Sequence, residues 1–525
     1  MHTADANVIA QITARGTDFP KATHLYRTVD IYGQNILCSE GAAWRYHRKL
    51  TSPLFAEKNI QLVWKETLDQ SQAMLESWLG PGGNGRTIRR VAGDTMRLSL
   101  NVISRAGLGQ KMEWQTAAEE SRAPGKSIPG GHTMSFTYSL RCLLDNLLYV
   151  MILPAWFLRN SPFAIMRKSY EAYDELGKYM KEMVAAKKTT IRSGASESST
   201  SDIIEQLIKG QDEWKNGKSQ SPTGFADSEV MGNLFVFVIA GHETSANSIH
   251  FSLLLLALHP EIQQEVQKEL TEVFQGRPIS EWDYDRDLPR LLTGMLCAVL
   301  NEQLRLIAPV IAVPKAVHSV PQQLVVDGKE VTVPANTMVR LCIPSVHRNP
   351  KFWPHGPPKY PQKPYFPLDN LDNDLEEFKP ERWVKGKNRT ADAVINIHAT
   401  ETKTADTEDP ETPASLYSPI RGSYIPFSEG QRACLGRRFA QVEILAALSV
   451  ILTQYSVELA VDEWASDEEV ERMTKEQKRE TWGKAEEKAH WIWQNKMGCI
   501  ITLQLRGACV PMRFVRRGEE RFRDL

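Results

Sequence analysis

The ten residues from Phe427 to Gly436 read FSEGQRACLG and lie immediately ahead of an apolar helical pattern. A thiolate that binds a metal is stabilised near the N-terminus of a helix, because unpaired N–H groups and the helix dipole favour negative charge there. Cys434 stands at that place. Gly430 permits a tight turn, Gly436 lets the backbone approach a flat group, and Arg432 offers a planar fork to a carboxylate. Phe427 can shield the sulfur. A structural cysteine at the end of a loop is the alternative, since buried cysteines are common.

The composition favours one kind of protein and excludes another. The chain has 525 residues, 42% of them hydrophobic, so it can bury a large core. Its formal net charge is −1, whereas a nucleic-acid-binding protein carries an excess of basic residues. We therefore expect no nucleic acid partner. The seven cysteines are too sparse and irregular for a disulfide framework, and no CxxC pair indicates zinc. We expect them to be reduced.

Apolar stretches raise the question of a membrane. The opening MHTADANVIAQITARGTDF is polar and broken by charge, which predicts neither a signal peptide nor a spanning segment. Residues 143–158 and 234–256 are apolar, but each contains polar or charged residues, which favours buried helices. For residues 143–158 a contact with a membrane surface stays open, because Trp156 and Arg159 suit an interface.

Helical periodicity dominates the rest of the chain. Apolar residues recur at helical spacing between Leu292 and Leu300 and again in residues 439–452. Short alternating runs predict strands or hairpins, namely QQLVVDG, KEVTVPA, YSVELAV and CIITLQL.

Three polar stretches, residues 193–201, 391–415 and 462–488, have the composition of solvated insertions, and the last is predicted to be helical and exposed. None of them separates two halves that each carry a full set of core elements. We therefore predict a single, mainly α domain over residues 1–525, with small β-sheets.

The pattern F-x-x-G-x-R-x-C-x-G resembles the haem-thiolate loop of the cytochrome P450 family, in its eukaryotic, microsomal and fungal form. Five fixed positions match by chance on the order of once in several thousand chains. In that family the cysteine is the axial ligand of haem iron. The resemblance thus implies haem b held by the Cys434 thiolate, with Phe427, Arg432 and Gly436 beside the cofactor.

Glu302 and Arg305 place opposite charges at i and i+3 of a helix, and FKPERW supplies Arg382 downstream. Together they resemble the Glu-Arg-Arg network that braces the haem-loop side of the family fold. An isolated ExxR pair would predict only a solvated surface pair.

The run AGHETS, residues 240–245, interrupts an apolar helix expected from about Met231 to Leu258. A mid-helix glycine costs about 1 kcal/mol relative to alanine. The run resembles the oxygen-binding helix of the family, where small residues make room over the iron and an acid–alcohol pair, here Glu243 and Thr244, relays protons. A kink with a back-bonded serine is the alternative. A zinc-protease HExxH motif is excluded, because alanine stands where the second histidine is required.

Trp44 and Arg48, at i and i+4, resemble the W-x-x-x-R helix whose indole and guanidinium bind a haem propionate. The alternative is an amphipathic helix with a packed tryptophan and a solvated arginine. Lys315 occupies a position where many members of the family carry a propionate-pairing basic residue, which lysine can serve only as a point charge.

One end of the chain departs from the family pattern. In eukaryotic members the W-x-x-x-R helix lies much deeper in the chain, so we expect the membrane anchor, the first helix and the first strands of the family fold to be absent. A strand near Met338 to Ile343 would then present an unpaired edge, which predicts poor expression or substoichiometric haem.

The resemblance implies a monooxygenase of secondary metabolism that inserts one oxygen atom of dioxygen into a lipophilic organic substrate, with electrons from a separate NADPH-dependent reductase. Family members of this type are bound to the endoplasmic reticulum membrane, whereas the location of this chain is left open. By analogy, the substrate would contact largely apolar segments at 28–37, 234–244, 309–314 and 497–505. A haem-thiolate isomerase or dehydratase is an alternative that the intact acid–alcohol pair disfavours, and a truncated, non-catalytic fragment is a third.

Overall fold

The computed structural model describes residues 1–80, 83–114, 128, 130–193, 203–215, 225–359, 372–384 and 416–523. Helices dominate these residues and the sheets are small, which confirms the predicted mainly α class. Contacts divide the chain into two compact units. Unit 1 comprises Met1–Pro20, Thr67–Ser99 and Glu243–Leu525, and unit 2 comprises Lys21–Glu66 and Leu100–His242. The single-domain organisation stays a prediction. The predicted insertion at 391–415 lies outside the described residues, as does all of 193–201 except Ser193.

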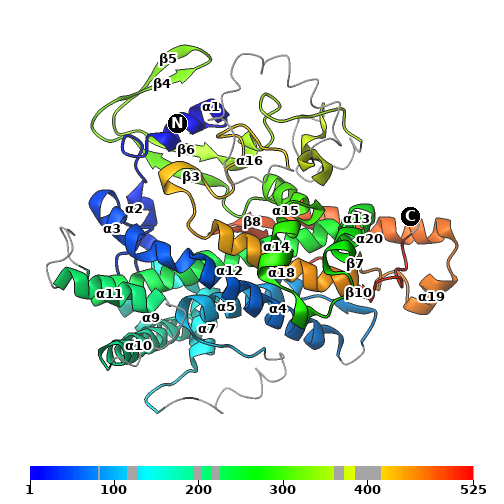
Figure 1. The fold of residues 1–525 in the computed structure, drawn as a ribbon, viewed down its shortest axis with the longest axis horizontal. Helices are drawn as coiled ribbons and strands as arrows, with labels where there is room; N and C mark the ends of the chain where they lie inside the picture. The colour runs from blue at the N-terminus through cyan, green and yellow to red at the C-terminus, as the bar shows by residue number, and fades with distance from the viewer. Residues whose placement is uncertain are drawn as a thin grey trace. The chain divides into compact units, whose positions relative to one another are not determined.

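Unit 1 carries most of the helices that bear the sequence motifs (Figure 1). Its longer helices are α1 (Ala6–Ala14), α13 (Pro260–Phe274), α14 (Tyr284–Leu292), α15 (Met295–Leu306), α18 (Arg437–Gln454) and α20 (Lys475–Lys496). Short helices are α16 (Ile343–Val346) and α19 (Asp467–Arg472), together with the 3-10 turns η3 (Ile279–Glu281), η4 (Asp374–Glu376), η5 (Pro380–Trp383) and η7 (Gly430–Arg432). Three helices contribute residues to both units: α4 (Glu57–Leu79), α5 (Val91–Leu108) and α12 (Asp227–Leu258).

The sheets of unit 1 are small and mostly antiparallel. One sheet has the order β1 (His2–Thr3), β6 (Met338–Cys342), β3 (Ala312–Ala316), and another has the order β2 (Arg86–Ile88), β10 (Met512–Arg516), β7 (Tyr455–Leu459). Two hairpins complete the set, β4 (Gln322–Val326) with β5 (Lys329–Val333) and β8 (Met497–Cys499) with β9 (Leu503–Leu505). The four alternating runs therefore form strands, as predicted.

The expected unpaired edge of the strand at Met338 is a wrong prediction. β6 pairs with β3 on one side and in parallel with β1 on the other, where His2 lies opposite Arg340 and Thr3 opposite Leu341. The amide of Arg340 also donates to the Met1 carbonyl at 2.9 Å. A strand of two residues is too short to give an alternating pattern, and the sequence therefore did not reveal it.

Unit 2 holds α2 (Thr23–Tyr26), η1 (Arg27–Val29), α3 (Gly41–Thr51), η2 (Ser52–Phe55), α7 (Phe136–Asp145), α8 (Leu147–Ile152), α9 (Ala155–Asn160), α10 (Ala164–Arg192) and α11 (Ile203–Lys215). Both α7 and α9 pack against α10 (Figure 1). The favoured burial of residues 143–158 is wrong for the second half of that stretch. Leu143 and Leu147 are buried, but Ile152 and Trp156 are each 69% exposed.

Other helical predictions need smaller corrections. The apolar pattern from Leu292 to Leu300 spans two helices, because α14 ends at Leu292 and α15 begins at Met295 after the N-cap Gly294. Residues 462–488 are largely helical as predicted, but they are not wholly exposed, since Val470 and Ala485 are buried. No helix among the described residues has both the length and the apolar character needed to cross a membrane.

Candidate functional site

The predicted thiol ligand lies on a turn that leads into α18. Cys434 is exposed and stands three residues before the first residue of the helix, so it precedes the helix N-terminus rather than opening it. Its amide donates to the Phe427 carbonyl at 2.8 Å, which closes the loop on itself. Gly436 is the N-cap of α18. The seven cysteines all lie in the described ranges, and no disulfide joins any two of them there.

Two glycines let α1 lie directly against this loop. Gly430 has φ 72°, the left-handed conformation predicted for a tight turn, and a Cβ there would stand 2.4 Å from the Thr13 carbonyl oxygen. Gly422 has φ 81°, and its Cβ would stand 2.1 Å from the Ala6 oxygen. Because any larger residue would push the two segments apart, the conformation of the thiol loop depends on α1.

Two cations in unit 1, the buried Lys315 and the half-buried Arg432, suit an anionic group. Lys315 on β3 is 1% exposed, and burial lowers its pKa to about 8. Among the described residues it makes no ion pair or hydrogen bond, so its charge lacks compensation within this part of the protein. Burial likewise lowers the pKa of Arg432 to about 10. Haem carries two propionates, so these cations and the exposed Cys434 thiol fit that group chemically.

Glu302, Arg305 and Arg382 meet in a fully buried cluster. Arg305 donates two hydrogen bonds of 2.7 and 2.8 Å to the Glu302 carboxylate, and Arg382 Nε lies 3.5 Å from Glu302 Oε1. Burial alone would raise the pKa of Glu302, but the Arg305 guanidinium more than offsets this and lowers it. The cluster is therefore a buried ion pair and not the solvated surface pair of the alternative reading.

His347 joins this cluster to the segment that leads into the thiol loop. Its Nδ1 lies 3.1 Å from the Arg305 carbonyl oxygen, and its Nε2 accepts from the Ile425 amide at 2.9 Å. A carbonyl only accepts and an amide only donates, so the ring is neutral with its proton on Nδ1. Burial lowers the pKa of His347 to about 3, which agrees with this state.

The structure keeps AGHETS helical within α12. In unit 2, Gly241 faces Ile103, whose side chain would lie 3.2 Å from an added Cβ. In unit 1, Gln504 Nε2 donates to Glu243 Oε1 at 2.8 Å, and burial raises the pKa of Glu243. The Thr244 carbonyl accepts from the Ser248 hydroxyl at 3.0 Å, so a back-bonded serine, which the alternative reading places at Ser245, stands about one turn later.

Glu443 on α18 is a carboxylic acid that the motifs did not single out. It is fully buried, and burial raises its pKa to about 8, although the Ser99 and Ser245 hydroxyls act in the opposite direction. Ser245 is the residue after Thr244, which places this acid next to the AGHETS segment.

Trp44 and Arg48 belong to α3 in unit 2. The Arg48 guanidinium carbon lies 5.5 Å from the centroid of the Trp44 ring, so the i, i+4 spacing brings the two side chains together as a cation–π pair. Trp44 is buried.

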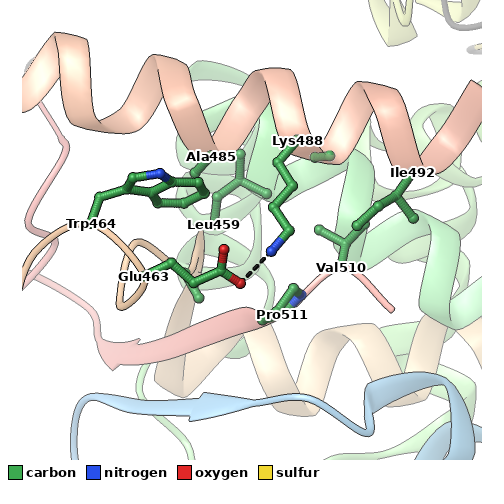
Figure 2. Close-up of a pocket in the computed structure, with 10 residues that line it drawn as sticks. Leu459, Glu463, Trp464, Ala485, Lys488, Ile492, Val510 and Pro511 are labelled. Carbon is green, nitrogen blue, oxygen red and sulfur yellow. Dashed lines mark hydrogen bonds and ion pairs between the residues drawn. The ribbon is translucent and has the colours of Figure 1, made fainter. Parts of the chain in front are cut away.

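A small cavity elsewhere in unit 1 carries no chemistry of this kind. It lies between α20 and the strands β7 and β10, holds about 10 Å³, and is lined by Leu459, Trp464, Ala485, Ile492, Val510 and Pro511 (Figure 2). Lys488 and Glu463, joined by the dashed ion pair in Figure 2, also line it. This space suits about one water molecule.

Sequence reasoning missed several partners of the motif residues. Trp383 Nε1 donates to Glu302 Oε2 at 2.9 Å, and its place beside Arg382 in FKPERW was a usable signal. Gln504 and His347 gave no such signal, because they stand far from their partners and follow no fixed spacing.

Comparison with known proteins gives consistent matches. The family model described as Cytochrome P450 matches residues 3–361 and 373–481. Cytochrome P450 monooxygenase 124 of Postia placenta is 30% identical over 461 residues, which cover 87% of this chain and 75% of that protein. The phomenoic acid biosynthesis cluster cytochrome P450 monooxygenase of Leptosphaeria maculans is 23% identical over 474 residues, covering 87% and 73%. The crystal structure of the cytochrome P450DA heme domain has a TM-score of 0.64 at 18% identity, over 98% of this chain and 87% of that one.

Proposed function

Because the chain belongs to the cytochrome P450 family, we propose that it is a haem-thiolate monooxygenase whose iron is bound by Cys434. It inserts one oxygen atom of dioxygen into a lipophilic organic substrate of secondary metabolism and takes its electrons from a separate NADPH-dependent reductase. The observation that carries this proposal is the thiol loop, in which Cys434 is exposed on a turn fixed by Gly430 and Thr13.

Haem supplies the activation of dioxygen when it is bound. Lys315 and Arg432 would hold its propionates, and this pairing would also compensate charges that burial disfavours in the protein alone. For Trp44 and Arg48 on α3, the resemblance to the W-x-x-x-R helix supports the proposal that they would bind a haem propionate. Glu243 holds a proton at its carboxyl and Thr244 passes it on through its hydroxyl, because a partly buried acid with a raised pKa retains its proton closer to neutral pH.

The remaining motif residues hold the thiol loop in shape. Glu302, Arg305 and Arg382 form the rigid base, and the neutral ring of His347 transmits its position to the backbone at Ile425. A buried network of this kind is stable only when every member is paired.

The reduced carbon monoxide complex tests the ligand assignment. We expect Cys434→Ser to abolish the thiolate-type absorption spectrum, because serine provides no thiolate, while Cys38→Ser, Cys297→Ser and Cys342→Ser leave the spectrum unchanged. Retention of the spectrum in Cys434→Ser, or its loss in one of the other three, would show that Cys434 is not the ligand.

Unit 2 also offers a surface for a peripheral membrane contact. Ile152, Trp156, Phe163 and Ile165, on or beside α8, α9 and the start of α10, are 49 to 69% exposed. Arg159 is exposed on α9 beside Trp156. Exposed aromatic and aliphatic side chains flanked by a cation have the chemistry of a membrane interface. We name these four apolar residues the α9 cluster and propose that they contact a lipid surface.

A further inference from the structure

The hairpin of β8 and β9 reaches Glu243 from a distant part of the sequence. Gln504 on β9 donates from Nε2 to Glu243 Oε1 at 2.8 Å. Thr502, just ahead of β9, is buried, and its side chain acts on the same carboxyl as a hydrogen-bonding group that lowers the Glu243 pKa. A carboxylate with two directed donors has far fewer accessible rotamers than one in contact with water alone.

Thr502 is itself held in orientation. Asn247, one helical turn after Glu243 on α12, donates from Nδ2 to Thr502 Oγ1 at 3.0 Å. The Thr502 hydroxyl has a single proton, and the Asn247 amide donates to one of its lone pairs. The proton of Thr502 is therefore available for donation to Glu243. The hydrogen bonds thus run from Asn247 through Thr502 to Glu243, in a sequence where each bond polarises the next.

Other groups around the carboxyl add charge. Arg506 acts on Glu243 electrostatically. Gly498, opposite Gln504 in the hairpin, leaves room for the Arg506 side chain, since a Cβ on Gly498 would stand 2.9 Å from Arg506 Cδ. Cys499 on β8 also lies within electrostatic reach of Glu243. Arg506 favours the charged carboxylate, whereas burial favours the protonated acid.

The hairpin is tied to a segment expected to contact substrate. The Leu503 amide donates to the Pro309 carbonyl at 2.9 Å, and residues 309–314 are one of the segments predicted to contact substrate. Leu503, the residue before Gln504, is therefore attached to that segment, while Gln504 itself donates to the acid.

We propose that Gln504 and Thr502 are positioning residues that fix the Glu243 carboxyl group for proton transfer. The two residues act through Glu243 and do not touch the reacting atoms. This inference rests on the proton-handling role proposed for Glu243.

The experiment measures the protonation of Glu243 in the resting holoenzyme, without turnover. The carboxyl C=O band is followed from about pH 4 to about pH 9 in difference infrared spectra, each variant minus the same variant carrying Glu243→Gln. Gln504→Leu removes a donor at similar volume, so we expect a further upward shift of the Glu243 pKa. Gln504→Lys provides a charged donor, so we expect a downward shift. Thr502→Val should shift the pKa upward, as Gln504→Leu does.

Each expected change is several-fold in the proton affinity of Glu243, and a general loss of structure would not give opposite signs for Leu and Lys at one position. Gln454→Leu is the matched control, because the Gln454 side chain is exposed and donates to the Val450 carbonyl of its own helix. If Gln504→Leu fails to retain haem, Gln504→Lys and Thr502→Val decide the question. An unchanged Glu243 pKa in the variants that fold would overturn the inference.

A second measurement separates this inference from the proposed function. With purified reductase, the ratio of hydrogen peroxide released to NADPH consumed is compared between wild type and Glu243→Gln. We expect the ratio to rise several-fold when proton delivery is lost. If the ratio is unchanged while the Gln504 variants shift the pKa as expected, the hairpin positions Glu243 but the proton role of Glu243 is wrong.

Discussion

At the scale of single residues, burial decides the charge of several side chains. Glu443 has a pKa raised to about 8 by burial, and burial lowers the pKa of His347 to about 3, so both are uncharged near neutral pH. Neutral groups can accept or donate inside the core without the cost of an unpaired charge. The two residues respond to pH in opposite ways, since Glu443 becomes charged as the pH rises and His347 becomes charged as the pH falls.

Glu443→Gln should change how stability depends on pH. The ordinary pKa of glutamate is 4.5 and the pKa of folded Glu443 is about 8. Between these values the folded chain binds more protons than the unfolded chain, so wild-type stability contributed by this group falls as pH rises. Glutamine cannot ionise, and its advantage over wild type should grow from pH 5 to pH 8, by on the order of 3 kcal/mol.

Thermal unfolding followed by circular dichroism across this pH range measures the effect. Glu330→Gln, which changes an exposed glutamate on β5, is the control and should show no such trend. A constant difference between Glu443→Gln and wild type at all pH values would contradict the buried neutral acid.

At the scale of elements, the contact between α1 and the thiol loop leaves no room for a side chain at Gly430. Gly430 and Gly276 share φ 72°, but only Gly430 has a neighbour where a Cβ would stand, and nothing lies within 4 Å of that position at Gly276. Substitutions at Gly276 and Gly430 therefore separate the cost of a left-handed backbone conformation from the cost of a steric clash.

Gly276→Ala should cost about 1–2 kcal/mol of unfolding free energy, from the left-handed conformation alone. Gly430→Ala should cost about 1–3 kcal/mol more and lower the haem content, because its Cβ would collide with the Thr13 carbonyl oxygen. Urea unfolding and the haem-to-protein ratio measure both. Equal losses in the two variants would mean that α1 can move away from the loop without penalty.

The α9 cluster gives a second prediction at this scale. Trp156→Asp should lower binding to vesicles of phosphatidylcholine and phosphatidylserine several-fold in a sedimentation assay, because it places a negative charge in the apolar surface. Trp491→Asp is the matched control, since Trp491 is 55% exposed on α20, outside the cluster. Equal binding of the two variants to the vesicles would contradict the proposal that the α9 cluster contacts a lipid surface.

At the scale of the whole molecule, the two-residue strand β1 covers the edge of β6 that the sequence led us to expect to be unpaired. β1 contributes only His2 and Thr3, yet it covers the side of β6 that β3 does not. Removal of His2, Thr3 and Ala4 should expose backbone groups of β6 and increase the aggregated fraction in size-exclusion chromatography, about two-fold or more.

A double variant, His2→Ala with Thr3→Val, keeps the backbone of β1 and should behave as wild type does. Aggregation by this variant to the same extent as the deletion would mean that side chains, and not strand pairing, protect the edge.

The sequence predicted those parts of the fold and the candidate site that depend on local spacing. Glu302 meets Arg305, and Trp44 meets Arg48, because i, i+3 and i, i+4 positions share one face of a helix. The contact of Gln504 with Glu243 joins residues 261 positions apart, and no periodicity encodes such a pair. The burial of Glu443 was equally hidden, since a glutamate in an apolar helix does not reveal what surrounds it.

The packing of α1 on the thiol loop also sets an order for biosynthesis. A ribosome makes α1 well before the residues around Gly430, so the turn that carries Cys434 and its supporting surface come together only after residue 430 has been synthesised. Haem acquisition should therefore follow synthesis of this turn, and nascent chains arrested before residue 430 should bind no haem in pull-down on haemin agarose beyond the level of a Cys434→Ser chain.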